Sequence, residues 1–234
     1  VIVELKNAGF DIDIINIPDR VYLLADDIFD EMVSRNVGEY RYPLGGKLYV
    51  FNKNENIGFI KGHMCSPAIA TQAEDLIAGG VKELIHVGYA GGLQPELVPG
   101  EIILTDGAFN DTAVARLYGY DYDIIHSSKD LTNEIEEMIT SAEILYKRGF
   151  HWTTDAGYRE TWGQVMDYRD KGALCVEMEG VGLFTIANYR KCVATGIYVV
   201  SDVYLEDDWK LGWEGNDIKK AVGEIIDMII KSIR

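Results

Sequence analysis

The chain has few positive charges for its size. Among its 234 residues, 22 are Lys or Arg and 38 are Asp or Glu, which gives a formal net charge of −16 at pH 7. A surface with this charge repels the phosphates of nucleic acids and the headgroups of anionic lipids. The charge balance therefore argues against a nucleic acid or a membrane as partner, and it leaves a small-molecule substrate open.

Cysteine is scarce, and long apolar runs are absent. The three cysteines, an odd number, lie in or beside apolar runs, which predicts reduced thiols rather than a disulfide framework. No apolar run approaches the length of a membrane span, and the first residues lack the apolar core of a secretory signal. We therefore expect a cytoplasmic protein. The cysteines and the four histidines show no metal-ligand spacing, so we predict no metal.

The chain is rich in short apolar segments, which alternate with helical patterns. This alternation predicts an α/β fold, and the length suits residues 1–234 as a single domain. Helices are expected at residues 67–78, 133–148 and 217–233, and the last has an apolar stripe that should pack on the sheet. Residues 205–215 predict a loop over one end of the sheet. Strands are expected at residues 48–51, 57–61, 83–87, 101–106, 150–154 and 192–201.

Two acidic residues stand at the ends of apolar elements. Glu179 precedes a largely apolar helical segment, so we expect it near the N-terminus of a helix. Asp202 follows the apolar run 192–201, so we expect it just past the carboxyl end of a buried strand. Open α/β sheets bind ligands at that end of their strands. A carboxyl group buried there can have a raised pKa and act as an acid near neutral pH.

Four segments, in the same order along the chain, carry a family resemblance. They are Val176-Glu-Met-Glu179 with Ser201-Asp202, the glycine-rich His86-Val-Gly-Tyr-Ala-Gly-Gly-Leu93, Val98-Pro-Gly-Glu-Ile-Ile-Leu-Thr105, and Ile17-Pro-Asp-Arg20. Together they resemble the purine nucleoside phosphorylase/uridine phosphorylase family. The resemblance implies a central mixed β-sheet, partly closed into a barrel and flanked by helices. It also implies a homodimer or homohexamer with the active site near the dimer interface.

The resemblance implies roles for the acidic motifs. Asp202, beside Ser201, would protonate N7 of a departing purine, and Glu179 would hold the sugar hydroxyls. Met178 would pack against the sugar, with Glu177 beside the base or sugar. Further contacts to base or sugar are implied for Tyr89, Ala90, Gly91 and Tyr158. As bare patterns, these acids are also compatible with turn capping or with the helix dipole.

The resemblance implies inorganic phosphate as co-substrate and no cofactor. Its phosphate ligands would be Arg20, expected before a helix at residues 21–29, with His86 and the backbone of Gly88. A further arginine, which dimeric members of the family lend across the interface, would be Arg41. The chain departs from the family at His86, which replaces an Arg, and at Tyr89, which replaces a Ser or Thr. Asn16 also replaces a Gly.

The leading hypothesis from the sequence is a pentosyltransferase, a nucleoside phosphorylase that converts a purine ribonucleoside and phosphate into free base and ribose 1-phosphate. The altered phosphate residues motivate an alternative, a nucleosidase of the same fold that uses water. A uridine phosphorylase is less favoured, because the chain lacks the Gln-x-Arg pair of pyrimidine-specific relatives. A non-catalytic nucleoside-binding homologue is a further alternative.

Overall fold

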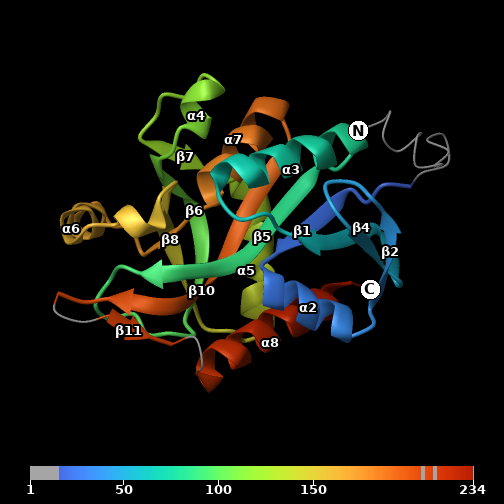
Figure 1. Ribbon diagram of the computed structural model, residues 1–234. Coiled ribbons are helices and arrows are strands. Elements are labelled where there is room, and N and C mark those ends of the chain that lie inside the picture. The colour runs from blue at the N-terminus through green and yellow to red at the C-terminus, as the bar shows by residue number, and fades with distance from the viewer. Residues whose placement is uncertain (1–15, 207–208, 213–214, 234) are drawn as a thin grey trace.

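The computed structural model describes residues 16–206, 209–212 and 215–233, and Figure 1 shows how its elements are arranged. The strands are β1 (Arg20–Leu24), β2 (Gly38–Tyr42), β3 (Leu48–Phe51), β4 (Asn54–Lys61), β5 (Glu83–Gly92), β6 (Ile102–Asp111), β7 (Ile124–His126), β8 (Tyr146–Thr154), β9 (Cys175–Glu177), β10 (Val193–Tyr204) and β11 (Trp209–Leu211). The helices are α2 (Asp26–Ser34), α3 (Ser66–Gly79), α4 (Val114–Leu117), α5 (Lys129–Ser141), α6 (Trp162–Asp170), α7 (Gly180–Arg190) and α8 (Asn216–Ser232), with a 3₁₀ turn at Gly157–Arg159.

Five strands close into a barrel. Strand β10 pairs with β6, β6 with β8, β8 with β9, β9 with β5, and β5 with β10 again. From β5 the sheet continues outward through β1, β4, β3 and β2. Parallel and antiparallel pairs both occur, so the sheet is mixed. The predicted α/β fold with a partly closed barrel is confirmed.

Helices cover the sheet on two sides (Figure 1). Helices α3, α4 and α7 pack together over one large apolar cluster. Helices α2, α5 and α8 pack over a second large apolar cluster. Helices α3 and α7 approach very closely at Gly182, where an added Cβ would lie 2.5 Å from the backbone oxygen of Ser66. This close approach places the start of α3 beside the start of α7.

Strands β1, β4, β5 and β10 bring their carboxyl ends to the same edge of the sheet. They run parallel, and Leu24 at the end of β1 pairs with Lys61 of β4 and Val87 of β5. Strand β10 pairs with β5 in the same direction. Helix α2 begins directly after β1, and the Ala25 amide donates to the Val87 carbonyl oxygen at 2.9 Å. This edge is where a ligand site is expected in an α/β sheet.

Several predicted boundaries were wrong, and each has a local cause. The expected helix at 133–148 ends at Ser141, because Glu143 adopts a left-handed conformation (φ 58°) and β8 begins at Tyr146. The strand expected at 83–87 is longer, since β5 continues through the glycine-rich segment to Gly92. The segment 205–215 was predicted as a loop. Of its described residues, three form the short strand β11, which pairs with the end of β10.

The expected helix at residues 21–29 is a strand followed by a helix. Val21 to Leu24 are fully buried in β1, between β4 and β5, and α2 starts only at Asp26. A strand covered on both faces reads as a continuous apolar run, which periodicity does not distinguish from a buried helix. In the part of the chain that the structure describes, every helix is too short or too polar to cross a bilayer.

Candidate active site

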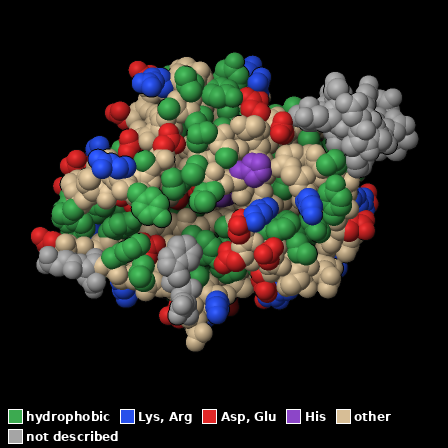
Figure 2. Space-filling model, in the orientation of Figure 1, with side chains coloured by type: hydrophobic (Ala, Val, Ile, Leu, Met, Phe, Trp, Pro, Cys, Tyr) green, Lys and Arg blue, Asp and Glu red, His purple; other side chains and the backbone are tan. Residues whose placement is uncertain are grey.

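A cavity of about 590 Å³ opens at the carboxyl edge of the sheet. Residues that follow β1, β4 and β9 contribute to its wall, as do the carboxyl ends of β5 and β10. Figure 2 shows histidine side chains on this face of the molecule, near a hollow at its middle. Glu177, Glu179 and Asp202 all line this one cavity, so the structure brings the two acidic motifs together.

Glu177 forms the turn between β9 and α7. One carboxylate oxygen accepts hydrogen bonds from the backbone amides of Glu179 and Gly180, both at 2.8 Å. The other accepts from Thr153 Oγ1 at 2.5 Å and lies 3.0 Å from His151 Nε2. Burial alone would raise the pKa of Glu177, but His151 and the Thr153 hydroxyl lower it to about 2. Glu177 is therefore an ionised anchor that orients the turn.

Glu179 lies at the N-cap position of α7, as the sequence predicted. Its Oε1 accepts from the Cys65 amide at 2.6 Å, and its Oε2 accepts from the Met178 amide at 3.3 Å. Burial and the nearby charge of Glu177 raise the pKa of Glu179 to about 8. The side chain is thus held at the cavity wall by backbone donors, in a position to accept hydrogen bonds from a ligand's hydroxyl groups.

Cys65 is a site residue that the sequence reasoning missed. It precedes α3 with a φ of 74°, a left-handed conformation that non-glycine residues adopt at some cost. This conformation points its amide at Glu179. The Ser66 hydroxyl donates to the Met178 carbonyl oxygen at 3.0 Å, so the start of α3 is joined to the β9–α7 turn twice. Only the backbone of Cys65 is used, which leaves no signal in the residue type.

Asp202 lies near the end of β10, at a register shift that follows Val200, and not past the strand as predicted. Its side chain is buried, and both of its oxygens accept hydrogen bonds. Ser201 Oγ donates to Oδ1 at 2.6 Å, and Trp209 Nε1 donates to Oδ2 at 2.7 Å. The predicted pair Ser201 and Asp202 therefore faces the cavity, with an indole from β11 beside it.

Aromatic side chains and a second carboxylate surround Asp202. Tyr204 and Trp209 stack with their ring centroids 6.2 Å apart. Tyr204 Oη donates to Glu160 Oε2 at 2.5 Å, and burial raises the pKa of Glu160 above its usual value. All three residues line the cavity, and none of them was predicted from the sequence. This part of the cavity, defined by Glu160, Asp202, Tyr204 and Trp209, is called the aromatic end below.

The opposite part of the cavity lies where β1 ends beside the middle of β5. Tyr89 Oη donates to Asp27 Oδ2 at 2.6 Å, and the Ile28 amide donates to Asp27 Oδ1 at 3.0 Å. His86 is buried against Tyr198, with 5.5 Å between the ring centroids. Burial lowers the pKa of His86 to about 4, so its ring is neutral at pH 7. This part, defined by Asp26, Asp27, His86 and Tyr89, is called the acidic end below.

The structure brings most of the other predicted residues to the cavity. Gly88, Tyr89, Ala90 and Gly91 of β5 line it, together with Met178. Tyr158 does not line it, because its side chain is fully exposed on the 3₁₀ turn. A sequence pattern places a tyrosine in a segment, but the local backbone decides which way the ring points.

The two arginines proposed as phosphate ligands lie elsewhere. Arg20 stands at the amino end of β1, away from the cavity edge, and pairs with Glu83 at 2.6 Å and Glu134 at 2.7 Å. Arg41, on β2, pairs with Glu39 and Glu55 and does not line this chain's cavity. The expectation for Arg20 assumed a helix directly after that residue, whereas a strand, β1, carries the chain from Arg20 to the ligand edge.

Three side chains in the cavity have the composition of a cation site. A ring nitrogen of His86 and carboxylate oxygens of Glu177 and Glu179 lie within 4.8 Å of one another. However, both oxygens of Glu177 already interact with other residues of the chain, and Glu179 accepts two backbone hydrogen bonds. We assign no metal to them, and the expectation of a metal-free site stays a prediction.

A closed barrel with an acid-lined cavity at its strand ends is the architecture of an α/β enzyme that acts on a small molecule. The chain belongs to the Phosphorylase superfamily, whose family description matches residues 14–231. This confirms the family resemblance, and the family is one of enzymes.

Relatives with curated names are purine nucleoside phosphorylases of the DeoD type. The protein from Exiguobacterium sibiricum is 29% identical over 188 residues, which cover 79% of this chain and 78% of the relative. One from another Exiguobacterium is 30% identical over 188 residues, covering 79% and 77%. A solved structure of the P. knowlesi homologue of P. falciparum PNP has a TM-score of 0.75 at 18% identity, and the match covers 92% of this chain and 88% of that one. That likeness supports the fold.

Proposed function

We propose that this protein cleaves the N-glycosidic bond of a purine nucleoside. The observation that carries the proposal is the position of Asp202 and Glu179 in one cavity, at the carboxyl edge of the sheet. The names of the curated relatives support the same class of substrate. The retained Ser201-Asp202 pair favours a purine over uracil, and no cofactor is required for this chemistry.

The aromatic end receives the base in this proposal. Cleavage leaves negative charge on the base, which a purine spreads onto N7. A proton from Asp202 to N7 stabilises the leaving group, and such general acid catalysis contributes about 10²–10⁴-fold to a rate. Trp209 Nε1 donates a hydrogen bond to one oxygen of Asp202. The incoming base replaces Trp209 as the partner of this oxygen.

Glu179 holds the sugar in this proposal. A ribosyl ring becomes flat and cationic as the glycosidic bond breaks, and a fixed carboxyl group that accepts hydrogen bonds from its hydroxyl groups orients it. The 2.6 Å hydrogen bond from the Cys65 amide fixes this carboxylate, and the ionised Glu177 fixes the turn on which it stands. The position of Glu179 is therefore set by backbone contacts before the substrate binds.

The test is the variant Asp202→Asn, assayed for release of free base from inosine and adenosine. The amide keeps the shape of the side chain but does not supply the proton. We expect the rate to fall by about 10²–10⁴-fold. Asp121→Asn, which changes an exposed aspartate outside the cavity, is the matched control and should keep the parental rate. Near-normal turnover by Asp202→Asn would remove Asp202 from this role.

The acceptor of the sugar is the second part of the function. The resemblance and the relatives' names favour phosphate, which would give ribose 1-phosphate. A hydrolytic reaction is the second candidate, because the acidic end of the cavity carries Asp27 and a neutral His86. Parallel assays with and without phosphate distinguish the two.

A homodimer or homohexamer is part of the same proposal. Met64 lines the cavity and is largely exposed, and Tyr158 is exposed on the neighbouring turn. Large apolar side chains on a surface are typical of protein interfaces. Light scattering coupled to size-exclusion chromatography tests the state directly, and a monomeric mass would contradict it.

A further inference from the structure

The acidic end of the cavity is built to repel an anion. Two acids, Asp26 and Asp27, lie at this end, and no Lys or Arg occurs among the described residues that line the cavity. An inorganic phosphate near pH 7 carries between one and two negative charges, and it is bound in proteins by guanidinium groups, ammonium groups or clustered backbone amides. The cavity of this chain supplies carboxylates instead.

Asp27 and Tyr89 form the wall of the acidic end, where β1 ends beside the middle of β5. The Tyr89 hydroxyl donates to Asp27 at 2.6 Å, so the ring of Tyr89 and the carboxylate of Asp27 form a bridge between α2 and β5. The Ala25 amide, which begins this turn, already donates to Val87. Neither the side chains nor this backbone amide is therefore available to surround an anion.

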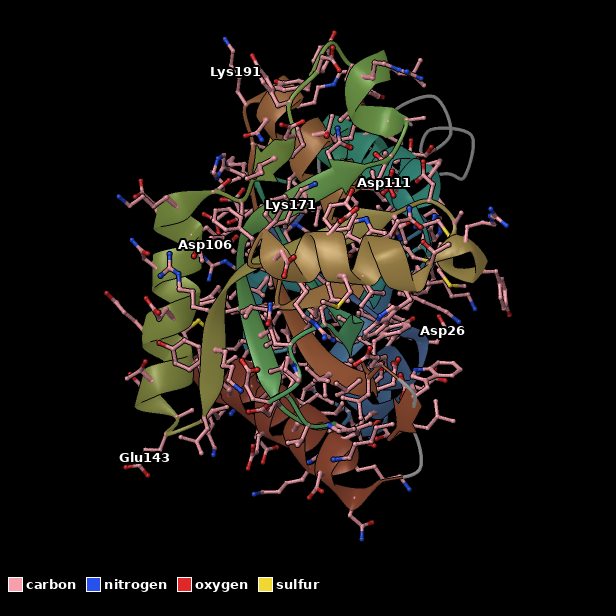
Figure 3. All side chains as sticks on the ribbon, turned by 90° about the vertical axis from the view of Figure 1, so that its left-hand side faces the viewer. Asp26, Asp106, Asp111, Glu143, Lys171 and Lys191 are labelled. Atoms are coloured by element: carbon pink, nitrogen blue, oxygen red, sulfur yellow. The ribbon has the colours of Figure 1, made fainter. Side chains whose placement is uncertain are left out.

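The cations on the strands that reach this edge are engaged in ion pairs, and so is Arg41 on β2, which pairs with Glu39 and Glu55. Lys61 Nζ lies 2.7 Å from Asp26, and the half-exposed pair compensates only that one carboxylate. Arg148 pairs with Asp106 and Glu136. In Figure 3 the labelled Asp106 lies on the opposite side of the view from Asp26, so this cluster is remote from the acidic end. Arg20 is bound at the amino end of β1.

His86 does not replace the missing charge. Its ring is buried, and Nδ1 lies 3.5 Å from the hydroxyl of Tyr198. Burial lowers its pKa to about 4, so the ring is a neutral imidazole at pH 7. A neutral imidazole binds and deprotonates a small neutral molecule better than it binds a phosphate. A ring nitrogen of His86 lies within 4.8 Å of Glu179, the residue assigned to the sugar.

We infer that water, and not phosphate, receives the sugar in this protein, and that His86 holds and deprotonates that water. The inference rests on the proposed function, because it uses the sugar position that Glu179 defines. It makes the enzyme a purine nucleoside hydrolase that retains the Phosphorylase superfamily fold.

The step balances without any further reactant. The water oxygen forms a bond to C1′ as the bond from C1′ to the base nitrogen breaks. The electron pair of the broken bond stays on the base, and Asp202 gives its proton to N7. The proton that water loses passes to His86, where the ionised Glu177 stabilises the resulting imidazolium. The products are free base and free ribose.

The experiment follows the unaltered protein with inosine and adenosine in phosphate-free buffer and at increasing phosphate concentrations. We expect the same rate throughout, with free ribose as the sugar product. Cleavage that requires phosphate, or ribose 1-phosphate as product, would overturn this inference and leave the proposed glycosidic cleavage standing. No cleavage in either buffer would overturn both.

Two further measurements use binding and a variant. Inorganic phosphate alone should leave the midpoint of thermal unfolding unchanged, and a stabilisation that saturates with phosphate would overturn the inference. His86→Gln should lower the hydrolytic rate by about 10²-fold, because the amide accepts no proton. His126→Gln, which changes an exposed histidine on β7, is the matched control. A His86→Gln protein that folds and hydrolyses at the parental rate would overturn the role of His86.

Discussion

The two ends of the cavity differ in how closely they follow the family to which the chain belongs. The aromatic end keeps the Ser201-Asp202 pair, and the neighbouring turn keeps Glu177 and Glu179, all held by short hydrogen bonds. The acidic end has replaced the expected Arg by a buried neutral His86 and has joined Tyr89 to Asp27. In the proposed reaction, the departing base and the acceptor are therefore contacted by different parts of one cavity.

At this edge of the sheet, the residues proposed to contact base and sugar match the family pattern, whereas the residues proposed to contact the acceptor differ from it. In the proposed reaction, the base and sugar contacts come from β9, the turn before α7 and β10, whereas the acceptor contacts come from β5 and the start of α2. Substitutions in β5 and α2 would then change the acceptor without moving the acids proposed to act on the base. Single substitutions test whether the aromatic end and the acidic end of the cavity act independently.

The largest effect is expected for Glu177→Gln. Glu177 is buried, lies 3.0 Å from His151 and accepts two backbone amides at 2.8 Å. Removing the ionised carboxylate weakens its hydrogen bonds to buried donors, and a buried donor left unsatisfied costs about 1–3 kcal/mol, so we expect urea denaturation to show a free energy of unfolding lower by about 3 kcal/mol. Glu74→Gln, which breaks the exposed pair with Arg190, is the control and should cost at most about 1 kcal/mol. Equal losses in the two variants would contradict the anchoring role.

The second prediction concerns pH and Glu179. Its pKa in the folded protein is about 8, against an ordinary value of 4.5. Between these values the folded protein keeps a proton that the unfolded chain releases. The stability from this group is therefore present at low pH and is lost as the pH rises through about 8.

The measurement is the free energy of unfolding at several pH values, for the parent and for Glu179→Gln. The parent should lose stability across the window from 4.5 to about 8, and the variant should lose less. Glu137→Gln, at an exposed position on α5, should follow the parent. A variant with the same pH dependence as the parent would show that Glu179 does not carry a raised pKa.

A smaller effect is expected for Glu160→Gln at the aromatic end. Glu160 lines the cavity as a carboxylate held by Tyr204, so it can accept a hydrogen bond from an exocyclic amino group of a base. We expect the ratio of kcat/KM for adenosine over inosine to fall about tenfold, which corresponds to about 1.4 kcal/mol. Tyr204→Phe, which releases Glu160 without removing it, should shift the ratio less. An unchanged ratio in Glu160→Gln would place base selection elsewhere.

The smallest effect is expected for Arg20→Gln, which tests the amino end of the sheet. Arg20 pairs with Glu83 and Glu134, both partly exposed, so we expect a loss of about 1 kcal/mol or less in stability. Nucleoside cleavage, with or without phosphate, should be unchanged. A loss of phosphate binding in this variant would restore Arg20 as a phosphate ligand.

Much of the fold follows from the apolar runs. Strands such as β3 and β10 were expected within a few residues, because their apolar residues form runs of strand length between turns. Strands β1, β2, β7, β9 and β11 were not predicted. β7, β9 and β11 are each three residues long, and the pattern of β1 resembles a helix because a fully buried strand shows no alternation.

The candidate site was predictable where several residues of one kind stand together. Glu177, Glu179 and Asp202 were found in this way, since acids beside apolar runs are unusual. Glu160 was missed because a single acid in a polar segment gives no signal, and Asp27 was missed because residues 21–29 were expected to form one helix. Only the pairing of distant strands brings Glu160 to Tyr204 and Asp27 to Tyr89, which lie 44 and 62 residues apart in the chain.

The close approach of α3 and α7 at Gly182 has a consequence for substrate affinity. A methyl group at that position would collide with the backbone of Ser66 and push the start of α3 away. The neighbouring Cys65 amide, which fixes the Glu179 carboxylate, would move with it. A substitution at Gly182 would therefore weaken the affinity for the ribose part of the substrate, although this residue lies on the buried side of a helix and is remote from any reacting atom.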